Sequence, residues 1–281
     1  MLIHRLKQYA LLMRLNKPIG IALLLWPTLW ALWLASHGQP HVTILLIFIA
    51  GVVLMRSAGC VVNDVTDRYI DGHVQRTLKR PLVTGTVTLL EAWFIAALLG
   101  MAAFFLVLLC NPLTIQLAFI GAGLTLIYPF MKRFTHLPQL GLGVAFAWGI
   151  LMAFAAETAS IPFSAWMVFA AGVIWPIIYD TMYAMADKAD DIKIGVKSTA
   201  ILFGHRDIQM IVGLQIIFIL LLVIIGGIFH LTSIYYISLI FVGAFFIYQQ
   251  RLIRHRDPKQ CFRAFLNNHW VGMIIFMGIY L

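Results

Sequence analysis

The feature that most limits the fold of this chain is a series of apolar stretches, each long enough to cross a lipid bilayer. A helix needs about 20 apolar residues to span ~30 Å of hydrocarbon, and such stretches recur along the whole sequence with short polar gaps. Only 11% of the residues are charged and 62% are hydrophobic, whereas about a quarter of the positions in a soluble protein carry charge. The sequence therefore predicts an all-α, polytopic membrane protein that forms one domain over residues 1–281.

Apolar length predicts about nine transmembrane helices, which places the two termini on opposite sides of the membrane. The last of them is short and contains Asn267, Asn268 and His269. The predicted spans are 19–36, 41–62, 88–109, 113–131, 139–157, 164–185, 208–229, 232–250 and 265–281.

The N-terminal segment, residues 1–17, precedes the first of these spans. It alternates apolar residues with Arg5, Lys7, Arg14 and Lys17, a pattern typical of an amphipathic helix at the membrane interface. An ordinary basic flank of the first span is the alternative. A signal peptide is disfavoured because span 19–36 is long and lacks a small-x-small cleavage site.

The basic residues give an orientation, since Lys and Arg accumulate in short cytoplasmic loops. The N-terminal segment and the connections 63–87, 132–138, 186–207 and 251–264 hold 19 of the 20 Lys and Arg residues. The alternate connections hold none, so the N-terminus is expected in the cytoplasm. The net charge of +9 therefore reflects membrane topology, and no nucleic acid partner is expected.

A first cluster of acidic residues closes the second predicted span. Asn63, Asp67 and Asp71 follow one another at intervals of four residues, and Asp64 lies three residues before Asp67. If the helix continues through them, all four side chains share one face. Carboxylates this close repel one another unless a divalent cation neutralises them.

A second cluster closes the sixth predicted span and contains Asp180, Asp187, Asp190 and Asp191. Asp180 and Asp187 are seven residues apart and Asp187 and Asp191 four, which again places them on one helical face. Four spans separate the two clusters. Because that number is even, both clusters open on the cytoplasmic side.

Two facing carboxylate clusters with Lys and Arg around them suit a diphosphate substrate and Mg²⁺. Mg²⁺ is commonly held by one or two carboxylates and completed by substrate phosphates. Basic side chains stabilise charge on a departing diphosphate, which lets the C–O bond break to an allylic cation. A solvated acidic face is the alternative, but it explains neither the paired spacing nor the placement on one side.

At these residues the sequence resembles the UbiA superfamily of intramembrane aromatic prenyltransferases, over nearly the whole chain. The family carries an NDxxDxxxD motif, which matches Asn63 to Asp71, and a later DxxxD motif, which matches Asp187 to Asp191. The string from Tyr179 to Thr199 is most similar to that of the 4-hydroxybenzoate polyprenyltransferases. The resemblance implies an all-helical fold, typically with nine spans.

The resemblance also implies roles for individual residues. Asp67, Asp71, Asp187 and Asp191 would be the catalytic residues that bind diphosphate through Mg²⁺. Asp64 would be a further metal ligand or would support the ligands. Among the remaining residues, Arg68 and Lys132 would contact the diphosphate, and Tyr128 would face the forming cation, because aromatic rings attract positive charge.

Arg56 stands out because it lies inside a predicted span, where an unpaired charge costs several kcal/mol. It precedes Asn63 by seven residues and shares its helical face. By the family resemblance, Arg56 binds the carboxylate of the aromatic acceptor and Asn63 contacts its ring or the nearby diphosphate. A planar guanidinium suits such a carboxylate. The alternative is a structural ion pair with Glu91 or a cluster aspartate.

The implied activity is Mg²⁺-dependent transfer of a polyprenyl group from polyprenyl diphosphate to the 3-position of 4-hydroxybenzoate, a step of ubiquinone biosynthesis. The implied location is a bacterial inner membrane, with the active site open to the cytoplasm. Homogentisate, a naphthoate or a porphyrin-type molecule is the alternative acceptor. A cation-coupled transporter is the alternative from another class, and it predicts charges near the bilayer midplane on broken helices.

Overall fold

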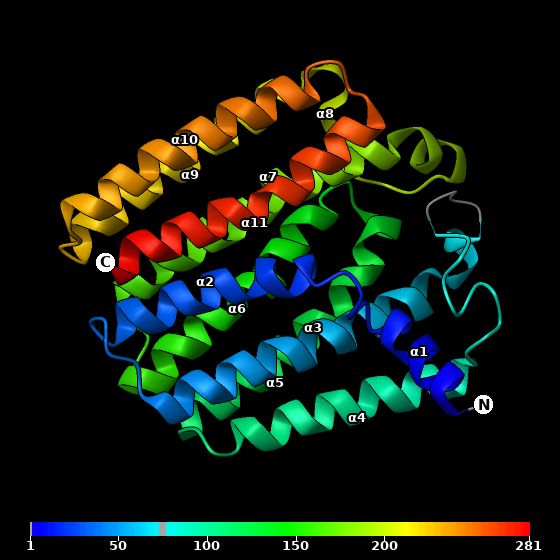
Figure 1. Ribbon diagram of the computed structural model, residues 1–281, viewed down its shortest axis with the longest axis horizontal. Helices are drawn as coiled ribbons and strands as arrows, with labels where there is room; N and C mark the ends of the chain where they lie inside the picture. The colour runs from blue at the N-terminus through cyan, green and yellow to red at the C-terminus, as the bar shows by residue number, and fades with distance from the viewer. Residues whose placement is uncertain (1, 73–76) are drawn as a thin grey trace.

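In the part of the chain that the structure describes, nine long helices run side by side along one axis of the molecule (Figure 1). The computed structural model describes residues 2–72 and 77–281, and those residues contain helices and no strands, which confirms the all-α prediction. Met1 and residues 73–76, which belong to the predicted N-terminal segment and the predicted connection 63–87, lie outside the described residues. The long helices are α2 (Ile19–Ala35), α3 (Val42–Asp71), α4 (Leu89–Val107), α5 (Pro112–Phe134), α6 (Pro138–Thr158), α7 (Phe163–Ile194), α9 (Asp207–Ile228), α10 (Ser233–Ile253) and α11 (Pro258–Tyr280).

Seven helical segments in the described part of the chain are long and apolar enough to cross a membrane, which confirms a polytopic protein. The two long helices outside this set are α2, which has 17 residues, and α11, which carries Asn267 and Asn268 near its middle. These amides are satisfied by neighbouring helices. Asn267 accepts a hydrogen bond from Gln249 at 3.1 Å, and buried Asn268 accepts one from Trp175 at 3.3 Å. α11 therefore packs inside the bundle despite its polar residues.

Three helix ends differ from those read from apolar length. α3 continues to Asp71 and α7 to Ile194, whereas the predicted spans ended at residues 62 and 185. The predicted spans ended before Asp64 in the first cluster and before Asp187 in the second, but the helices continue and carry these carboxylates on one face. α7 ends where Gly195 adopts a left-handed φ of 72°, a conformation that favours glycine. α11 begins before the predicted residue 265, because Asp257 caps its first turn by accepting a hydrogen bond from Gln260.

The short elements gather at the end of the bundle that carries the basic residues. α1 (Leu2–Leu12) lies across the ends of α3 and α4, and α8 (Thr199–Phe203) lies at the same end, whereas the C-terminus lies at the opposite end (Figure 1). Tyr9 of α1 donates a hydrogen bond to Glu91 at 2.8 Å, while Ile3 is 84% exposed. An apolar side chain exposed on a helix that crosses the bundle end suits the interfacial placement predicted for residues 1–17.

α6 and α7 approach closely in the middle of the bundle, and this contact fixes the helix that bears the second cluster. A Cβ at Gly143 would lie 2.5 Å from the carbonyl oxygen of Val173, so only glycine permits this approach. Buried Ile150, Trp175 and Ile178 belong to the same core. Small residues at such contacts let helix backbones come together in membranes.

Candidate active site

A polar cavity of about 550 Å³ opens at the end of the bundle that carries the charged connections. Both acidic clusters line it. α3 supplies the first cluster and α7 the second, and each helix is unbroken through its cluster. The carboxylates that line the cavity are Asp64, Asp67, Asp71, Asp180, Asp187 and Asp191. The structure thus brings together residues that are more than a hundred positions apart in the sequence.

The carboxylates of the first cluster are buried and form ion pairs with basic side chains from other parts of the chain. Asp64, Asp67 and Asp71 are 2%, 2% and 5% exposed. Arg14 lies 2.6 Å from Asp64, Arg80 pairs with both Asp64 and Asp71, and Lys132 lies 2.5 Å from Asp67. Burial of a carboxylate is tolerated because each of these partners offsets part of the desolvation penalty.

Arg14 remains charged in this setting. Burial tends to lower the pKa of its guanidinium, but the adjacent Asp64 carboxylate outweighs that effect and holds the pKa above its ordinary value. Arg14 follows α1, and together with Arg80 it surrounds Asp64 with positive charge. The cavity wall therefore presents cations as well as carboxylates.

Asp67 retains an unused oxygen that suits a metal ligand. One carboxylate oxygen pairs with Lys132, while Oδ1 is buried with no hydrogen-bond partner among the described residues. A buried acceptor without a partner is costly, and oxygen is the donor atom that Mg²⁺ prefers. Within residues 2–72 and 77–281, no three His, Cys, Asp or Glu side chains are close enough to hold a metal by themselves. This fits a site that substrate oxygens complete.

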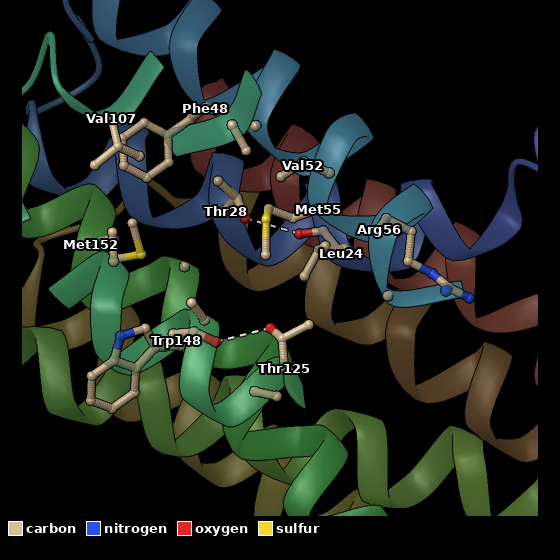
Figure 2. A pocket seen from close by; sticks show the side chains of 18 of the residues that line it. Leu24, Thr28, Phe48, Val52, Met55, Arg56, Val107, Thr125, Trp148 and Met152 are labelled. Atoms are coloured by element: carbon tan, nitrogen blue, oxygen red, sulfur yellow. Dashed lines mark hydrogen bonds between the residues drawn. The ribbon is translucent and has the colours of Figure 1, made fainter. Parts of the chain in front are cut away.

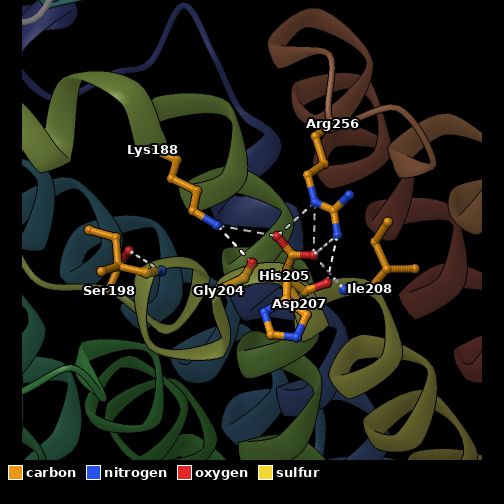
Figure 3. Close-up of polar contacts among 8 residues, drawn as sticks. Lys188, Ser198, Gly204, His205, Asp207, Ile208 and Arg256 are labelled. Atoms are coloured by element: carbon orange, nitrogen blue, oxygen red, sulfur yellow. Dashed lines mark hydrogen bonds and ion pairs between the residues drawn. The ribbon is translucent and has the colours of Figure 1, made fainter.

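A second group of charges, Lys188, Asp207 and Arg256, holds the end of α7 against neighbouring segments (Figure 3). Lys188 follows Asp187 and donates to the Gly204 carbonyl at 2.9 Å, with the buried Asp207 carboxylate 3.4 Å away. Arg256, between α10 and α11, donates to both oxygens of Asp207, the shortest distance being 2.7 Å. This tether joins α7, the start of α9 and the loop before α11.

An apolar pocket of about 180 Å³ lies beside the polar cavity. It runs among α2, α3, α4, α5 and α6, and Figure 2 shows Arg56 at one end with Phe48 and Val107 at the other. Arg56, Tyr128 and Phe146 line both spaces. The arrangement can therefore accept a molecule with a charged head in the polar cavity and an apolar tail in the pocket.

Arg56 has no carboxylate within ion-pair distance in the described part of the chain. Its Nη1 donates to Cys60, and its guanidinium lies 5.9 Å from the centre of the Phe146 ring. Its Nε is buried without a partner. Glu91, one of the partners considered for a structural ion pair, instead pairs with Arg5 at 3.0 Å. The guanidinium thus faces the two spaces with a donor unused.

The predicted contact residues differ in where the structure places them. Asn63, Tyr128 and Lys132 line the polar cavity. Arg68 does not, because its guanidinium turns to the neighbouring Tyr69, 4.4 Å from the ring centre. Arg14 and Arg80 take part instead. Both stood in basic segments of the sequence, but which cation reaches the cavity depends on the path of the loops.

Sequence reasoning also missed Tyr179, whose hydroxyl is buried without a partner among the described residues and whose side chain lines the polar cavity. Its position one residue before Asp180 was the available signal.

The cavity lies at one end of the long helices, and the two cluster helices are continuous. Neither observation matches the midplane charges on broken helices that a cation-coupled transporter predicts.

Comparison with known proteins gives matches over nearly the whole chain. Residues 24–274 match the model of the UbiA prenyltransferase family. A protein of Vibrio vulnificus (strain CMCP6) named 4-hydroxybenzoate octaprenyltransferase is 55% identical over 281 residues, which cover 100% of this chain and 99% of that protein.

Two solved structures share the architecture. A UbiA homologue from Aeropyrum pernix K1, solved without ligand, has a TM-score of 0.81 and 26% identity over 92% of this chain and 96% of its own. A UbiA homologue from Archaeoglobus fulgidus bound to GPP and Mg²⁺ has a TM-score of 0.74 and 16% identity over 98% of this chain and 100% of its own. At that identity the second likeness shows the fold alone.

Proposed function

Because the chain belongs to the UbiA prenyltransferase family, we propose that it transfers a polyprenyl group from a polyprenyl diphosphate to 4-hydroxybenzoate, as a step of ubiquinone biosynthesis. The single observation that carries this proposal is the pair of acidic clusters in one cavity that adjoins an apolar pocket. The full-length relative named 4-hydroxybenzoate octaprenyltransferase supports the choice of acceptor.

In the proposed donor site, the diphosphate lies between the two clusters. Asp67 and Asp71 on one side and Asp187 and Asp191 on the other would hold Mg²⁺, and the unpartnered Asp67 Oδ1 supports this assignment. When bound, Mg²⁺ neutralises the charge that accumulates on the diphosphate oxygens. Asp64 supports the site from behind, because it orients Arg14 and Arg80.

Basic residues of the cavity wall promote departure of the diphosphate. Lys132, which lies 2.5 Å from Asp67, and Arg80 stand where they can donate to the leaving group. Charge-assisted donors of this kind stabilise a developing anion more strongly than neutral donors. Tyr128 lines both spaces, which supports a role for its ring beside the prenyl C1 carbon, where positive charge develops. An aromatic face stabilises such a cation.

The acceptor carboxylate is assigned to Arg56, with Asn63 close to its ring. The absence of a carboxylate partner for Arg56 in the described residues and its unpartnered Nε support this role. The ring carbon ortho to the hydroxyl attacks the allylic cation and forms the new C–C bond. Loss of the proton on that carbon restores aromaticity, and no covalent enzyme intermediate is involved.

The prenyl tail occupies the apolar pocket among α2 to α6, which Figure 2 shows.

We place the chain in a bacterial inner membrane with the basic end of the bundle in the cytoplasm, since 19 of the 20 Lys and Arg residues lie in connections at that end or in the N-terminal segment. Residues 1–17 would then lie at the membrane interface, and residues 1–281 would form a single membrane domain.

The test is transfer of a labelled polyprenyl group in membranes that contain the protein, with 4-hydroxybenzoate as acceptor, with and without Mg²⁺. Asp67→Asn removes a proposed metal ligand. Asp190→Asn is the matched control, because Asp190 does not line the cavity and pairs with exposed Lys193. We expect 3-prenylated product only with Mg²⁺, and product from the control but not from Asp67→Asn.

Other outcomes correct the proposal at different levels. Release of diphosphate with homogentisate or a naphthoate, but not with 4-hydroxybenzoate, would replace the acceptor and keep the prenyl transfer. Full activity of Asp67→Asn would remove the proposed metal site. No release of diphosphate with any aromatic acceptor would refute the prenyl transfer itself.

A further inference from the structure

Gly20, in the first turn of α2, lies directly against the guanidinium of Arg56 on α3. A Cβ at Gly20 would lie 2.7 Å from Cζ of Arg56 and closer still to Nε and Nη2. Real side chains do not approach this closely, so any residue with a Cβ at position 20 must displace the guanidinium. Gly20 is buried, and both residues line the polar cavity.

Few other contacts hold the guanidinium in place. Within the described part of the chain, Nη1 donates to Cys60, the Phe146 ring centre lies 5.9 Å away, and no carboxylate is in ion-pair range. An arginine with one sulfur acceptor and one ring contact can rotate about its long side chain. The backbone of α2 at Gly20, which has no side chain, is therefore the contact that restricts the position of the Arg56 guanidinium.

We propose that Gly20 is a positioning residue that sets the Arg56 guanidinium for the carboxylate of the aromatic acceptor. The inference rests on the proposed function, in which Arg56 binds that carboxylate. A methyl group at position 20 would push the guanidinium out of its place, because the three nearest atoms that it meets all belong to Arg56. A shift of about 1 Å in a substrate-positioning group is enough to lower activity by as much as ~100-fold.

A packing role for Gly20 makes a different prediction. If glycine were needed for helix packing, Gly20→Ala would destabilise the protein, as a clash with backbone does. Here the atoms that a Cβ meets belong to the far end of a flexible side chain, which moves at small cost. Alanine also favours a helix over glycine. The midpoint of thermal unfolding should therefore stay unchanged or rise while acceptor binding weakens.

The experiment is a double-mutant cycle with Gly20→Ala, Arg56→Ala and the double variant, in the full chain in detergent or membranes. The readouts are the KM for 4-hydroxybenzoate, the KM for the polyprenyl diphosphate, kcat and the unfolding midpoint. Gly213→Ala in α9 is the matched control, because a Cβ there meets no heavy atom within 4 Å.

We expect Gly20→Ala to raise the acceptor KM roughly 10- to 100-fold and to leave the donor KM within about twofold. In the Arg56→Ala background Gly20→Ala should add nothing, because the group that it displaces is gone. Gly213→Ala should match the wild type in both KM values.

Each contrary outcome separates the inference from the proposed function. If Arg56→Ala raises the acceptor KM and Gly20→Ala does not, the inference is wrong and the acceptor site stands. If Gly20→Ala destabilises the protein equally with and without Arg56, Gly20 is a packing residue and the inference is wrong. If Arg56→Ala leaves the acceptor KM unchanged, the acceptor carboxylate binds elsewhere, so the inference and the role of Arg56 are wrong while prenyl transfer to 4-hydroxybenzoate stands.

Discussion

Replacement of Asp207 by asparagine tests whether the charged tether at the end of α7 stabilises the fold. The Asp207 carboxylate is 0% exposed and accepts from Nε and Nη2 of Arg256 at 3.0 and 2.7 Å, with Lys188 Nζ 3.4 Å away (Figure 3). Asparagine keeps the shape and one acceptor oxygen but removes the negative charge. Lys188 and Arg256 then face each other across a neutral group.

The expected loss follows from the burial of the three side chains. Breaking a buried ion pair by removing one partner costs about 3–5 kcal/mol. The side chains of Arg256 and Lys188 are 42% and 25% exposed, so water compensates part of that loss, and we expect roughly 2–3 kcal/mol. For a chain of this size each kcal/mol shifts Tm by about 2–4 °C, which gives a fall of roughly 4–12 °C.

The assay is thermal unfolding in detergent, followed by tryptophan fluorescence, with Asp190→Asn as the matched control. Asp190 also lies at the end of α7, but its partner Lys193 is 3.5 Å away and 74% exposed. An exposed pair of this kind contributes about 0–1 kcal/mol, so the control should shift Tm by no more than ~4 °C. Equal Tm shifts for the two variants would show that the buried pair of Asp207 stabilises the fold no more than the exposed pair of Asp190 does.

Three further predictions concern the reaction. Arg80→Ala should lower kcat/KM by about 100- to 1000-fold, as loss of a donor to a developing anion does, whereas Arg68→Ala should stay within about threefold of wild type because Arg68 does not line the cavity. Steady-state kinetics compare the two variants, and a larger loss for Arg68→Ala than for Arg80→Ala would contradict the cavity assignment. Gly51→Leu should raise the KM for a long-chain polyprenyl diphosphate and leave the KM for 4-hydroxybenzoate unchanged, because Gly51 lines the apolar pocket and a Cβ there meets open space; an equal rise in both values would argue against a separate tail pocket. Removal of divalent cations with EDTA should abolish prenyl transfer and added Mg²⁺ should restore it, and persistent turnover in EDTA would contradict the metal assignment.

The sequence predicted the class of fold and the two acidic clusters because these depend on local pattern. Apolar length set the number of long helices, and the four-residue spacing placed Asp67 and Asp71 on one face of α3. Helix ends were less accurate, since α3 and α7 continue past their apolar parts through Asp71 and Asp191. Hydropathy does not predict that a helix continues through charged residues when those residues face a cavity inside the protein.

The choice among basic residues could not be predicted, because it depends on long-range geometry. Arg68 lies beside the first cluster in sequence, yet it turns to Tyr69, while Arg80 and Arg14 come from a loop and from the segment after α1 to reach Asp64. Likewise the close approach of Gly20 to Arg56 joins two different helices, α2 and α3. Spacing along one helix contains no information about such contacts.

The placement of the diphosphate between the two acidic clusters is tested by a structure of the protein with Mg²⁺ and a slowly reacting prenyl thiolodiphosphate. We expect the diphosphate and metal between Asp67 and Asp71 on α3 and Asp187 and Asp191 on α7, with the first prenyl carbons beside Tyr128 and the tail in the apolar pocket. A diphosphate bound outside the polar cavity, or a tail that avoids the pocket among α2 to α6, would contradict it.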